Sequence, residues 1–201
     1  FTVDQKGFIN AREAAAQLSR EVKKETSETL ELQAEQTATL QNQGVKPTDD
    51  SFQYSWKDVT DAKVQAIFTK KNGFVDSIDS TTFSEDDILG FVLDKTAFYS
   101  QKGGQIYDTG FLVTSEGGRF EVTDVRVFAG FVFHTGYLQE GEFTVGEIIK
   151  TQVDFERRRP IASNHTATHV LNYSLRKHLK ETDQEGSMVD HEKLRFDFSY
   201  N

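Results

Sequence analysis

The chain has 201 residues, of which 36% are hydrophobic and 27% are charged, and its net charge at pH 7 is −9. This composition indicates a globular protein and excludes a disordered or membrane-spanning chain. No cysteine is present, so disulfides, thiol catalysis and cysteine-ligated zinc within this chain are excluded. The acidic total does not favour nucleic-acid binding. Residues 156–201 nevertheless carry a net charge of +1, so any contact with a polyanion is expected there.

Residues 1–50 are the least strand-like part of the sequence and predict a helical segment. Residues 10–13 resemble a capping box, which predicts a helix over Ala11–Lys24. A second helix is predicted over Glu28–Gln43, and Gly44 follows at the position where glycine commonly ends a helix.

Residues 51–155 are rich in Phe, Val, Ile and Thr, and turn signals recur every eight to twelve residues. Short strands at this spacing predict a small, mainly antiparallel barrel or sandwich. The predicted strands are Lys63–Lys70, Phe74–Ile78, Ile88–Leu93, Gly110–Thr114, Phe120–Phe128, Gly130–Tyr137 and Glu147–Val153.

Residues 156–201 change character again. A helix is predicted from Ser163, or from Asn164, to Lys180, because either residue is a favourable N-cap and Pro160 lies just upstream. A turn through Asp183–Gly186 and strands over Ser187–Val189 and Lys193–Phe198 are expected to follow. This pattern is typical of the start of an α+β domain.

The sharpest motif is the pair His165 and His169, which are four residues apart on the predicted helix. Side chains at this spacing share one helix face, so both imidazoles could bind one zinc ion. Thr166 stands where zincins carry their catalytic glutamate, which excludes that class. The alternative is a pair of surface histidines. The other histidines, none with ligand spacing to the pair, are His134, His178 and His191.

A second motif is Gly103-Gly104-Gln105. Paired glycines either let the backbone approach a ligand, so that the Gln105 amide can face a polar substrate, or form the turn of a β-hairpin. From these residues alone the hairpin is favoured. No Gly-Lys-Ser/Thr run follows, so a P-loop is excluded.

Two further motifs lie near the histidine pair. Arg157, Arg158 and Arg159 precede the helix and can contact a nucleic-acid backbone; the alternative is a solvated charge cluster. The segment Asp183–Val189 either forms an ordinary turn and strand or returns Gln184 towards the histidines.

Taken together, these motifs resemble the editing domain of alanyl-tRNA synthetases, in a form that looks eukaryotic. Their order and spacing agree over residues 50–201, and Phe1–Phe8 is similar to the segment that leaves the tRNA-recognition region of that family. The residues that carry the resemblance are Leu93–Phe98, Gly103–Gln105, Asp108–Gly110, Arg157–Pro160, Asn164–His169, Gly186–Ser187 and Arg195–Phe198.

The resemblance implies an α+β fold in three parts. Residues 1–50 would be a helical connector, residues 51–155 a small β-barrel, and residues 156–201 the start of an α+β editing domain shared with threonyl-tRNA synthetase. The sequence begins at Phe1 and ends at Asn201. Both ends look cut, so we expect a truncated fragment of a longer ligase.

The implied activity is hydrolysis of the ester that joins serine or glycine to tRNA(Ala). The family's zinc ligands are a histidine pair, matched by His165 and His169, and a later Cys-x-x-x-His pair that this chain lacks. We therefore expect the fragment alone to be inactive. The parent ligase would charge tRNA(Ala) with alanine, using ATP and Mg²⁺ bound in another domain.

Within this resemblance, Thr166 and Thr168 are expected to shape the pocket. Gln105 and Gln184 are candidates for orienting the aminoacyl group or the attacking water, and residues 157–159 for contacting the acceptor end of the tRNA. The expected partners are tRNA(Ala) and the other domains of the parent, with no membrane and no DNA. A cytoplasmic location is expected, with a mitochondrial pool left open.

Two other functions stay open at this point. One is a free-standing trans-editing hydrolase with the same chemistry. The other is a non-catalytic barrel that binds tRNA or a protein, for which the histidine pair would be dispensable.

Overall fold

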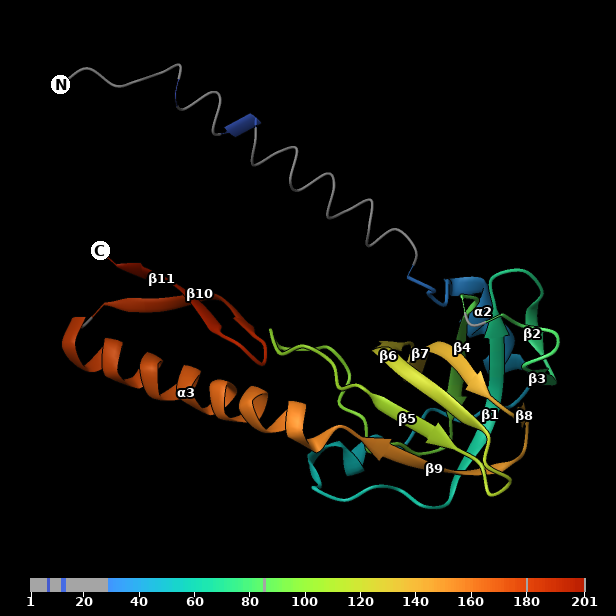
Figure 1. Ribbon diagram of the computed structural model, residues 1–201. Coiled ribbons are helices and arrows are strands. Elements are labelled where there is room, and N and C mark those ends of the chain that lie inside the picture. Colours follow the sequence, from blue (N-terminus) through green and yellow to red (C-terminus); the bar gives the residue numbers. More distant parts are fainter. Residues whose placement is uncertain (1–6, 8–11, 14–28, 85, 180, 201) are drawn as a thin grey trace. The chain divides into compact units, whose positions relative to one another are not determined.

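The computed structural model describes residues 7, 12–13, 29–84, 86–179 and 181–200 (Figure 1). The chain divides into two compact units, residues 1–30 and residues 31–201. Apart from residues 12 and 13, which are helical, the helix predicted over Ala11–Lys24 lies outside the described residues. No helix in the described part of the chain is both long enough and apolar enough to cross a membrane. Every element named below belongs to the second unit.

The second predicted helix, over Glu28–Gln43, is shorter than expected: α2 spans Ala34–Asn42. Its predicted end is confirmed. Gly44 has a φ of +76°, a conformation that glycine adopts without steric cost. Its N–H donates to the carbonyl of Gln41 at 3.0 Å, which satisfies one of the free carbonyls at the helix end.

An antiparallel sheet of seven strands forms the body of this unit, in the order β2-β1-β4-β7-β6-β5-β9. Since β9 also pairs with β1, six of these strands pair in a closed ring. The mainly antiparallel β-structure predicted for this region is confirmed. The strands of this sheet are β1 (Ala62–Thr69), β2 (Gly73–Val75), β4 (Ile88–Leu93), β5 (Gly110–Val113), β6 (Arg119–Phe128), β7 (Phe131–Glu140) and β9 (Ile148–Val153). Two further strands, β3 (Ser77–Asp79) and β8 (Glu142–Thr144), form a separate two-stranded sheet.

Phenylalanine rings fill the core of this sheet. Phe91, Phe120 and Phe143 are fully buried, and the ring of Phe91 lies 4.6 Å and 5.3 Å from the other two, measured between ring centroids. On the opposite face of β4, a Cβ on Gly90 would lie 2.0 Å from the ring of Phe133. Glycine at this position therefore lets Phe133 pack directly against the strand.

One predicted strand is divided in the structure. The run Phe74–Ile78 changes partner halfway: β2 pairs with β1, whereas β3 pairs with β8. Strand β8 was not predicted, because Glu140-Gly141-Glu142 has the composition of a turn. Gly141 does turn the chain, with a φ of +78°, and β8 starts directly after it.

The predicted start of the long helix is wrong. Helix α3 spans Phe155–Leu179, so it begins before Pro160 and not at Ser163 or Asn164. Asp154 supplies the cap, because its carboxylate accepts the N–H of Arg157 at 2.9 Å. Pro160 removes one helical N–H donor without ending the helix.

The predicted turn through Asp183–Gly186 is also wrong. These residues lie inside β10 (Thr182–Val189), which pairs with β11 (Leu194–Tyr200) in a two-stranded sheet beside α3 (Figure 1). The pairing is irregular between Gln184, which lies opposite Phe198, and Gly186, which lies opposite Asp197. The two strands that the sequence predicted here are therefore confirmed but longer than expected.

Candidate functional site

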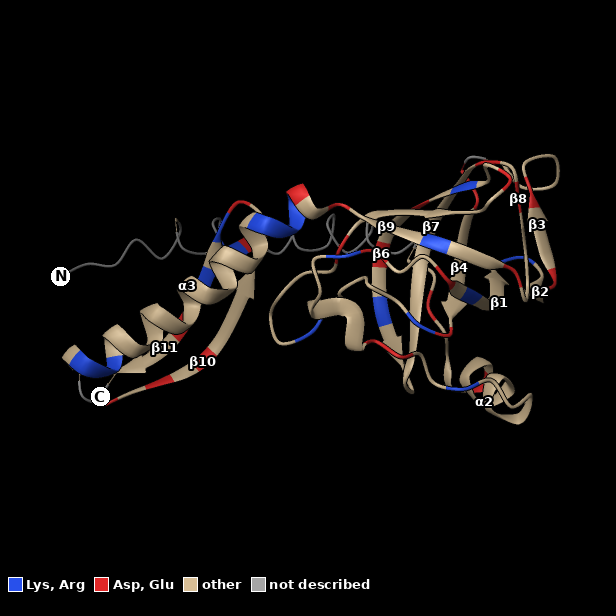
Figure 2. Cartoon of the chain, turned by 90° about the horizontal axis from the view of Figure 1, so that it is seen from below, with Lys and Arg blue, Asp and Glu red and all other residues tan. Residues whose placement is uncertain are grey.

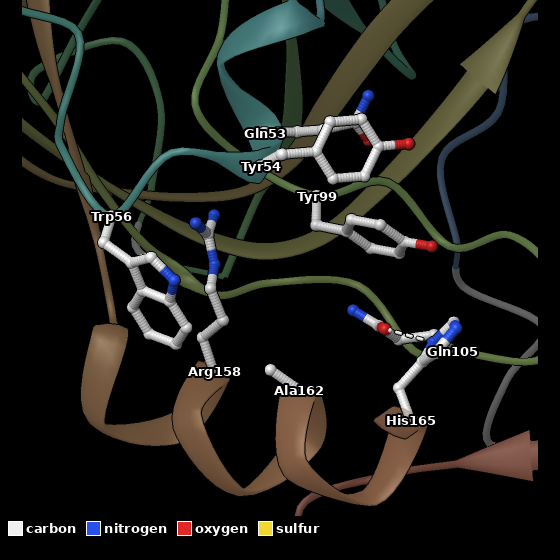
Figure 3. A pocket seen from close by; sticks show the side chains of 8 residues that line it. All are labelled: Gln53, Tyr54, Trp56, Tyr99, Gln105, Arg158, Ala162 and His165. Carbon is white, nitrogen blue, oxygen red and sulfur yellow. Dashed lines mark hydrogen bonds between the residues drawn. The ribbon is translucent and has the colours of Figure 1, made fainter. Parts of the chain in front are cut away.

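A pocket of about 370 Å³ lies where three segments meet (Figure 3). One is a short 3₁₀ helix, η2 (Ser51–Tyr54), with the residues that follow it. The second is the long connection between β4 and β5, and the third is α3. The side chains that line the pocket are Gln53, Tyr54, Trp56, Tyr99, Gln105, Arg158, Ala162 and His165.

Helix α3 supplies one wall of this pocket. Arg158, Ala162 and His165 follow one another at intervals of four and three residues, so they lie on the same helix face. Figure 3 shows the three side chains rising from successive turns, with Arg158 towards Trp56 and His165 beside Gln105. The pocket thus has an aromatic end and an end where polar side chains meet.

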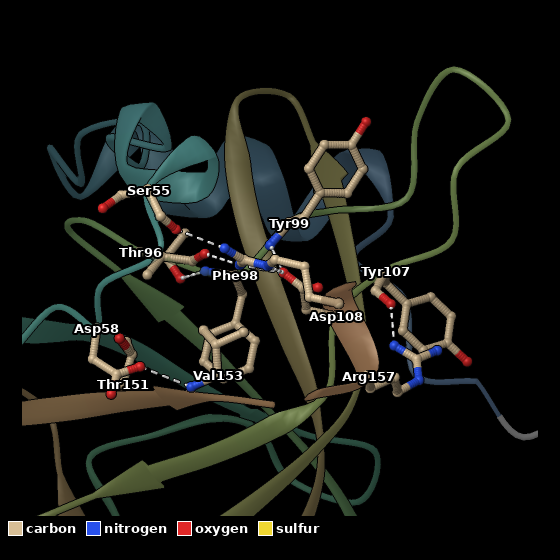
Figure 4. Close-up of polar contacts among 12 residues, drawn as sticks. Ser55, Asp58, Thr96, Phe98, Tyr99, Tyr107, Asp108, Thr151, Val153 and Arg157 are labelled. Atoms are coloured by element: carbon tan, nitrogen blue, oxygen red, sulfur yellow. Dashed lines mark hydrogen bonds and ion pairs between the residues drawn. The ribbon is translucent and has the colours of Figure 1, made fainter. Parts of the chain in front are cut away.

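A buried ion pair fixes the start of α3 against the sheet. The Nε and Nη2 atoms of Arg158 both donate to one carboxylate oxygen of Asp108, and the two side chains are only 6% and 2% exposed. The same guanidinium donates to the carbonyls of Ser55 and Ala97, at 2.8 Å and 2.6 Å. That Asp108 oxygen also accepts the N–H of Tyr99 (Figure 4). These contacts join all three segments of the pocket.

The glycine motif forms the hairpin turn that the sequence favoured. Lys102 and Gln105 exchange backbone hydrogen bonds, and Gly103 and Gly104 between them have φ values of +59° and +83°, as in a tight hairpin turn. A Cβ on Gly104 would lie 2.4 Å from the carbonyl oxygen of Ser187. The glycine therefore permits the close approach to β10 that places Gln105 beside α3.

Gln105 and His165 form a hydrogen bond at the polar end of the pocket. Gln105 is 8% exposed, and its Oε1 lies 2.7 Å from Nδ1 of His165. Because a carbonyl oxygen can only accept, Nδ1 carries a proton, and in the neutral imidazole Nε2 then keeps its lone pair. The imidazole of His169, whose side chain is exposed, lies 5.1 Å from that of His165 between ring centroids.

The surroundings of His165 favour its neutral state. Burial, together with the neighbouring imidazole of His169, lowers the pKa of His165 below its ordinary value. A neutral imidazole with a free Nε2 has the form that a metal ion requires. Within the described ranges, no three His, Asp or Glu side chains gather closely enough to hold a metal ion.

The structure separates the remaining predicted residues. Thr166 is exposed and Thr168 is buried, and each hydroxyl donates to the carbonyl four residues earlier in α3. Gln184 lies in β10 opposite Phe198, with its side chain exposed. The fold therefore brings Gln105 to His165, whereas Gln184 stands on the β10–β11 sheet.

The three consecutive arginines differ in their surroundings. Arg158 is buried in the ion pair described above. Arg157 is half-buried and donates to the carbonyl of Tyr107 at 2.6 Å (Figure 4). Arg159 is exposed. Of the three, Arg159 has the side chain most accessible to a partner.

The other histidines have no part in the pocket. His134 is fully buried in β7, where Nε2 lies 2.8 Å from the hydroxyl of Thr96 and Nδ1 lies 3.3 Å from the carbonyl of Phe91. Burial lowers its pKa to about 4. His178 and His191 are exposed.

Sequence reasoning missed the aromatic wall of the pocket, which is formed by Tyr54, Trp56 and Tyr99. The available signal was the segment Phe52–Trp56, in which aromatic residues alternate with polar ones. Alternation of this kind predicts a half-buried strand. The structure instead has a 3₁₀ helix that leaves the aromatic rings exposed.

The comparisons with known proteins agree with one another. The family model described as tRNA synthetases class II (A) matches residues 1–157. The chain is 41% identical over 205 residues to the cytoplasmic alanine–tRNA ligase of Dictyostelium discoideum, an alignment that covers 100% of this chain and 21% of the relative. It is 40% identical to the mitochondrial alanine–tRNA ligase of Saccharomyces cerevisiae and 42% identical to the alanine–tRNA ligase of Candida albicans. Each of these alignments covers 98% of this chain and 20% of the relative.

The chain thus spans about one fifth of the length of these relatives. The relatives are eukaryotic, as the resemblance in the sequence suggested, and the family match extends over most of the chain. This chain therefore belongs to the class II (A) tRNA synthetases.

Proposed function

We propose that this chain is part of an alanine–tRNA ligase and that its pocket forms part of an editing site. The reaction would be hydrolysis of the ester that links serine or glycine to tRNA(Ala). The observation that carries the proposal is the hydrogen bond between Gln105 and His165, since it joins two separate motifs of the sequence in one concave site. The parent would charge tRNA(Ala) with alanine, using ATP and Mg²⁺ in another domain.

An alanine ligase needs a second site on physical grounds. One methylene changes binding in an apolar pocket by only about 1–3 kcal/mol, so a pocket for alanine cannot strongly exclude glycine. Such a pocket also rejects an added hydroxyl weakly, which admits serine. Hydrolysis of the wrong product in a separate pocket supplies the missing discrimination.

In this proposal His165 and His169 are two ligands of a zinc ion. The donor set fits the ion. The Gln105 carbonyl accepts the Nδ1–H of His165, and a carbonyl is a usual second partner of a metal-bound imidazole. This hydrogen bond leaves Nε2 of His165 free to bind the metal. When bound, zinc supplies a Lewis acid that polarises a carbonyl or acidifies a water. A tetrahedral site needs two more ligands, which we place in the parent downstream of this chain as a cysteine and a histidine.

The remaining site residues keep supporting roles in the proposal. Thr168, which is buried in the same helix, would help to shape the pocket, and Thr166 and Gln184 would face the substrate from the exposed surfaces on which they lie. Basic residues stand near both ends of α3 (Figure 2). Arg159, which is exposed at the first of these ends, is the arginine best placed to contact the acceptor end of the tRNA.

The elements of the fold would correspond to subdomains of the editing region. The closed ring of six strands would be the β-barrel subdomain of the editing region. Helix α3 and the β10–β11 sheet would be the first part of its α+β subdomain, and residues 1–50 a connector from the tRNA-recognition region. A cytoplasmic location is proposed, as printed for the Dictyostelium discoideum relative, with a mitochondrial pool left open, as printed for the Saccharomyces cerevisiae relative.

Hydrolysis of seryl-tRNA(Ala) by the full-length parent tests the proposal. Gln105→Ala should slow hydrolysis by about 10- to 100-fold, the usual effect of removing the outer partner of a metal ligand, and His169→Ala should slow it at least as much. His178→Ala, which removes an exposed histidine from the last turn of the same helix, is the matched control and should have no effect. Equal rates for all four proteins, or none for the wild type, would instead indicate a non-catalytic binding module.

A further inference from the structure

The segment that follows Asp50 exposes an unusual number of aromatic rings. Phe52, Tyr54 and Trp56 are 38%, 71% and 53% exposed. Single exposed apolar residues are common on soluble proteins, but a cluster of them beside a pocket marks a binding surface. Tyr54 and Trp56 line the pocket described above, and Phe52 does not.

Hydrogen bonds fix the conformation of this segment. Gln53 is 4% exposed, and its Nε2 donates to the carboxylate of Asp50 at 2.8 Å. The N–H of Ser55 donates to the carbonyl of Phe52, and the carbonyl of Ser55 accepts from Arg158. Because the backbone is fixed at these points, the exposed rings are displayed in set positions and bind with little loss of conformational entropy.

Each ring is packed over part of its surface and exposed over the rest. Trp56 packs against Phe155, with centroids 5.8 Å apart, yet half of its surface is exposed. Tyr54 meets Tyr99 edge-on, with centroids 6.4 Å apart, and most of its surface is exposed. Figure 3 shows Trp56 beside Arg158, and Tyr54 beside Tyr99. The exposed parts of the two rings can accept a flat, apolar ligand group.

The charges around the rings do not favour a phosphate as the bound group. The two cations that lie over these rings already have carboxylate partners: Arg158 is paired with Asp108, and Nζ of Lys102 lies 3.4 Å from the carboxylate of Asp50. Lys102 also lies 5.8 Å from the ring centroid of Tyr54. What the aromatic end offers is therefore ring faces rather than free positive charge, and nucleobases stack on such faces.

We propose that Tyr54 and Trp56 form a stacking platform for the terminal nucleobase of the aminoacylated RNA. This inference rests on the proposed editing function, because the ester of the same nucleotide would then lie at the other end of the pocket, beside Gln105 and His165. The volume of about 370 Å³ lies within the range of roughly 300–1,000 Å³ that is usual for sites of small organic ligands. Tyr54 and Trp56 are thus positioning residues that determine how tightly the RNA end binds.

The test measures KM and kcat for hydrolysis of seryl-tRNA(Ala) by the full-length parent, with Tyr54→Ala and Trp56→Ala. Loss of one base–ring stack weakens binding by about 5- to 150-fold. We expect KM to rise by a factor in this range for each variant, with a much smaller change in kcat. Tyr54→Phe and Trp56→Phe keep a ring and should restore most of the lost affinity.

A second substrate separates stacking from other effects. In seryl-tRNA(Ala) whose terminal nucleotide carries no base, the wild type and the two alanine variants should have the same KM, since there is no base to stack. An equal KM on the intact substrate would overturn the proposal, and so would a KM difference that persists on the abasic one. A loss of thermal stability without a KM change would instead assign the rings to a contact with protein.

The outcomes distinguish this inference from the proposed function. If wild-type protein hydrolyses the intact substrate and the alanine variants match it, the editing function stands and the platform is rejected. If the wild type hydrolyses nothing, the editing function fails. The platform is then judged by the binding of a short single-stranded RNA that ends in the acceptor sequence, with and without its terminal base.

Discussion

At the scale of single residues, the pocket depends on one buried pair of charges. Arg158 and Asp108 are almost wholly removed from solvent, which costs free energy that only their mutual hydrogen bonds and attraction offset. Arg158 also satisfies two backbone carbonyls of the surrounding segments. Removing one partner leaves the other charge buried without compensation.

The first prediction concerns this pair. Asp108→Asn keeps the shape of the side chain but removes its charge, so the free energy of unfolding should fall by about 3–5 kcal/mol, as measured by urea denaturation. Asp183→Asn is the matched control, because Asp183 forms an exposed ion pair with Arg176 and such pairs contribute about 0–1 kcal/mol. Similar losses for the two variants would contradict the structural role given to Asp108.

His134 gives a prediction about pH. Burial lowers its folded pKa to about 4, whereas the unfolded value is about 6.5. The unfolded chain therefore binds the proton first as the pH falls. The contribution of His134 to the free energy of unfolding is fully present above pH 6.5 and is lost as the pH falls towards 4. At 1.36 kcal/mol per unit, the loss from this group between pH 7 and pH 4 is about 3 kcal/mol.

His134→Gln removes this titration while keeping an amide that can bond to Thr96. The fall in unfolding free energy between pH 7 and pH 4 should therefore be smaller in the variant than in the wild type by about this amount. His178→Gln, at an exposed position, should leave the pH dependence of the wild type intact. Parallel pH profiles for all three proteins would show that His134 does not titrate as described.

At the scale of elements, the start of α3 is the clearest test of the fold. The structure places the cap at Asp154 and puts Ser163 inside the helix. Asp154→Ala should lower the free energy of unfolding by about 0.5–2 kcal/mol, the usual effect of losing a cap. Ser163→Ala should change it by less than about 0.5 kcal/mol. If thermal or urea unfolding reversed this order, the helix would begin where the sequence alone predicted.

The elements also show which sequence signals are reliable. Ile88–Leu93 and the Gly44 helix end were predicted correctly because each depends on local chemistry: a run of apolar residues, or a backbone angle that only glycine adopts easily. The turn predicted through Asp183–Gly186 failed because its polar residues are held in β10 by pairing with β11. The start of α3 was misjudged for a similar reason, since distant contacts of Arg158 stabilise the turn before Pro160.

At the scale of the whole molecule, the pocket joins residues that are far apart in the sequence. Gln105 and His165 are 60 residues apart, and Ser55 and Arg158 are 103 apart. The sequence named Gln105 and the histidine pair as candidates, but only the fold shows that Gln105 meets His165 while Gln184 stands apart. Tyr54 and Trp56 could not be found in this way, because exposure of an aromatic ring depends on the packing around it.

The order of these segments along the chain has a consequence for how the protein folds during synthesis. Strand β9 ends at Val153 and α3 begins at Phe155, so the closed ring of strands can form before α3 is made. Until Arg158 has been synthesised, burial of the Asp108 carboxylate is unfavourable, because no opposite charge offsets the loss of its hydration. Contacts of such long sequence separation also form slowly. The pocket therefore cannot be complete until α3 has been made, after the ring of strands.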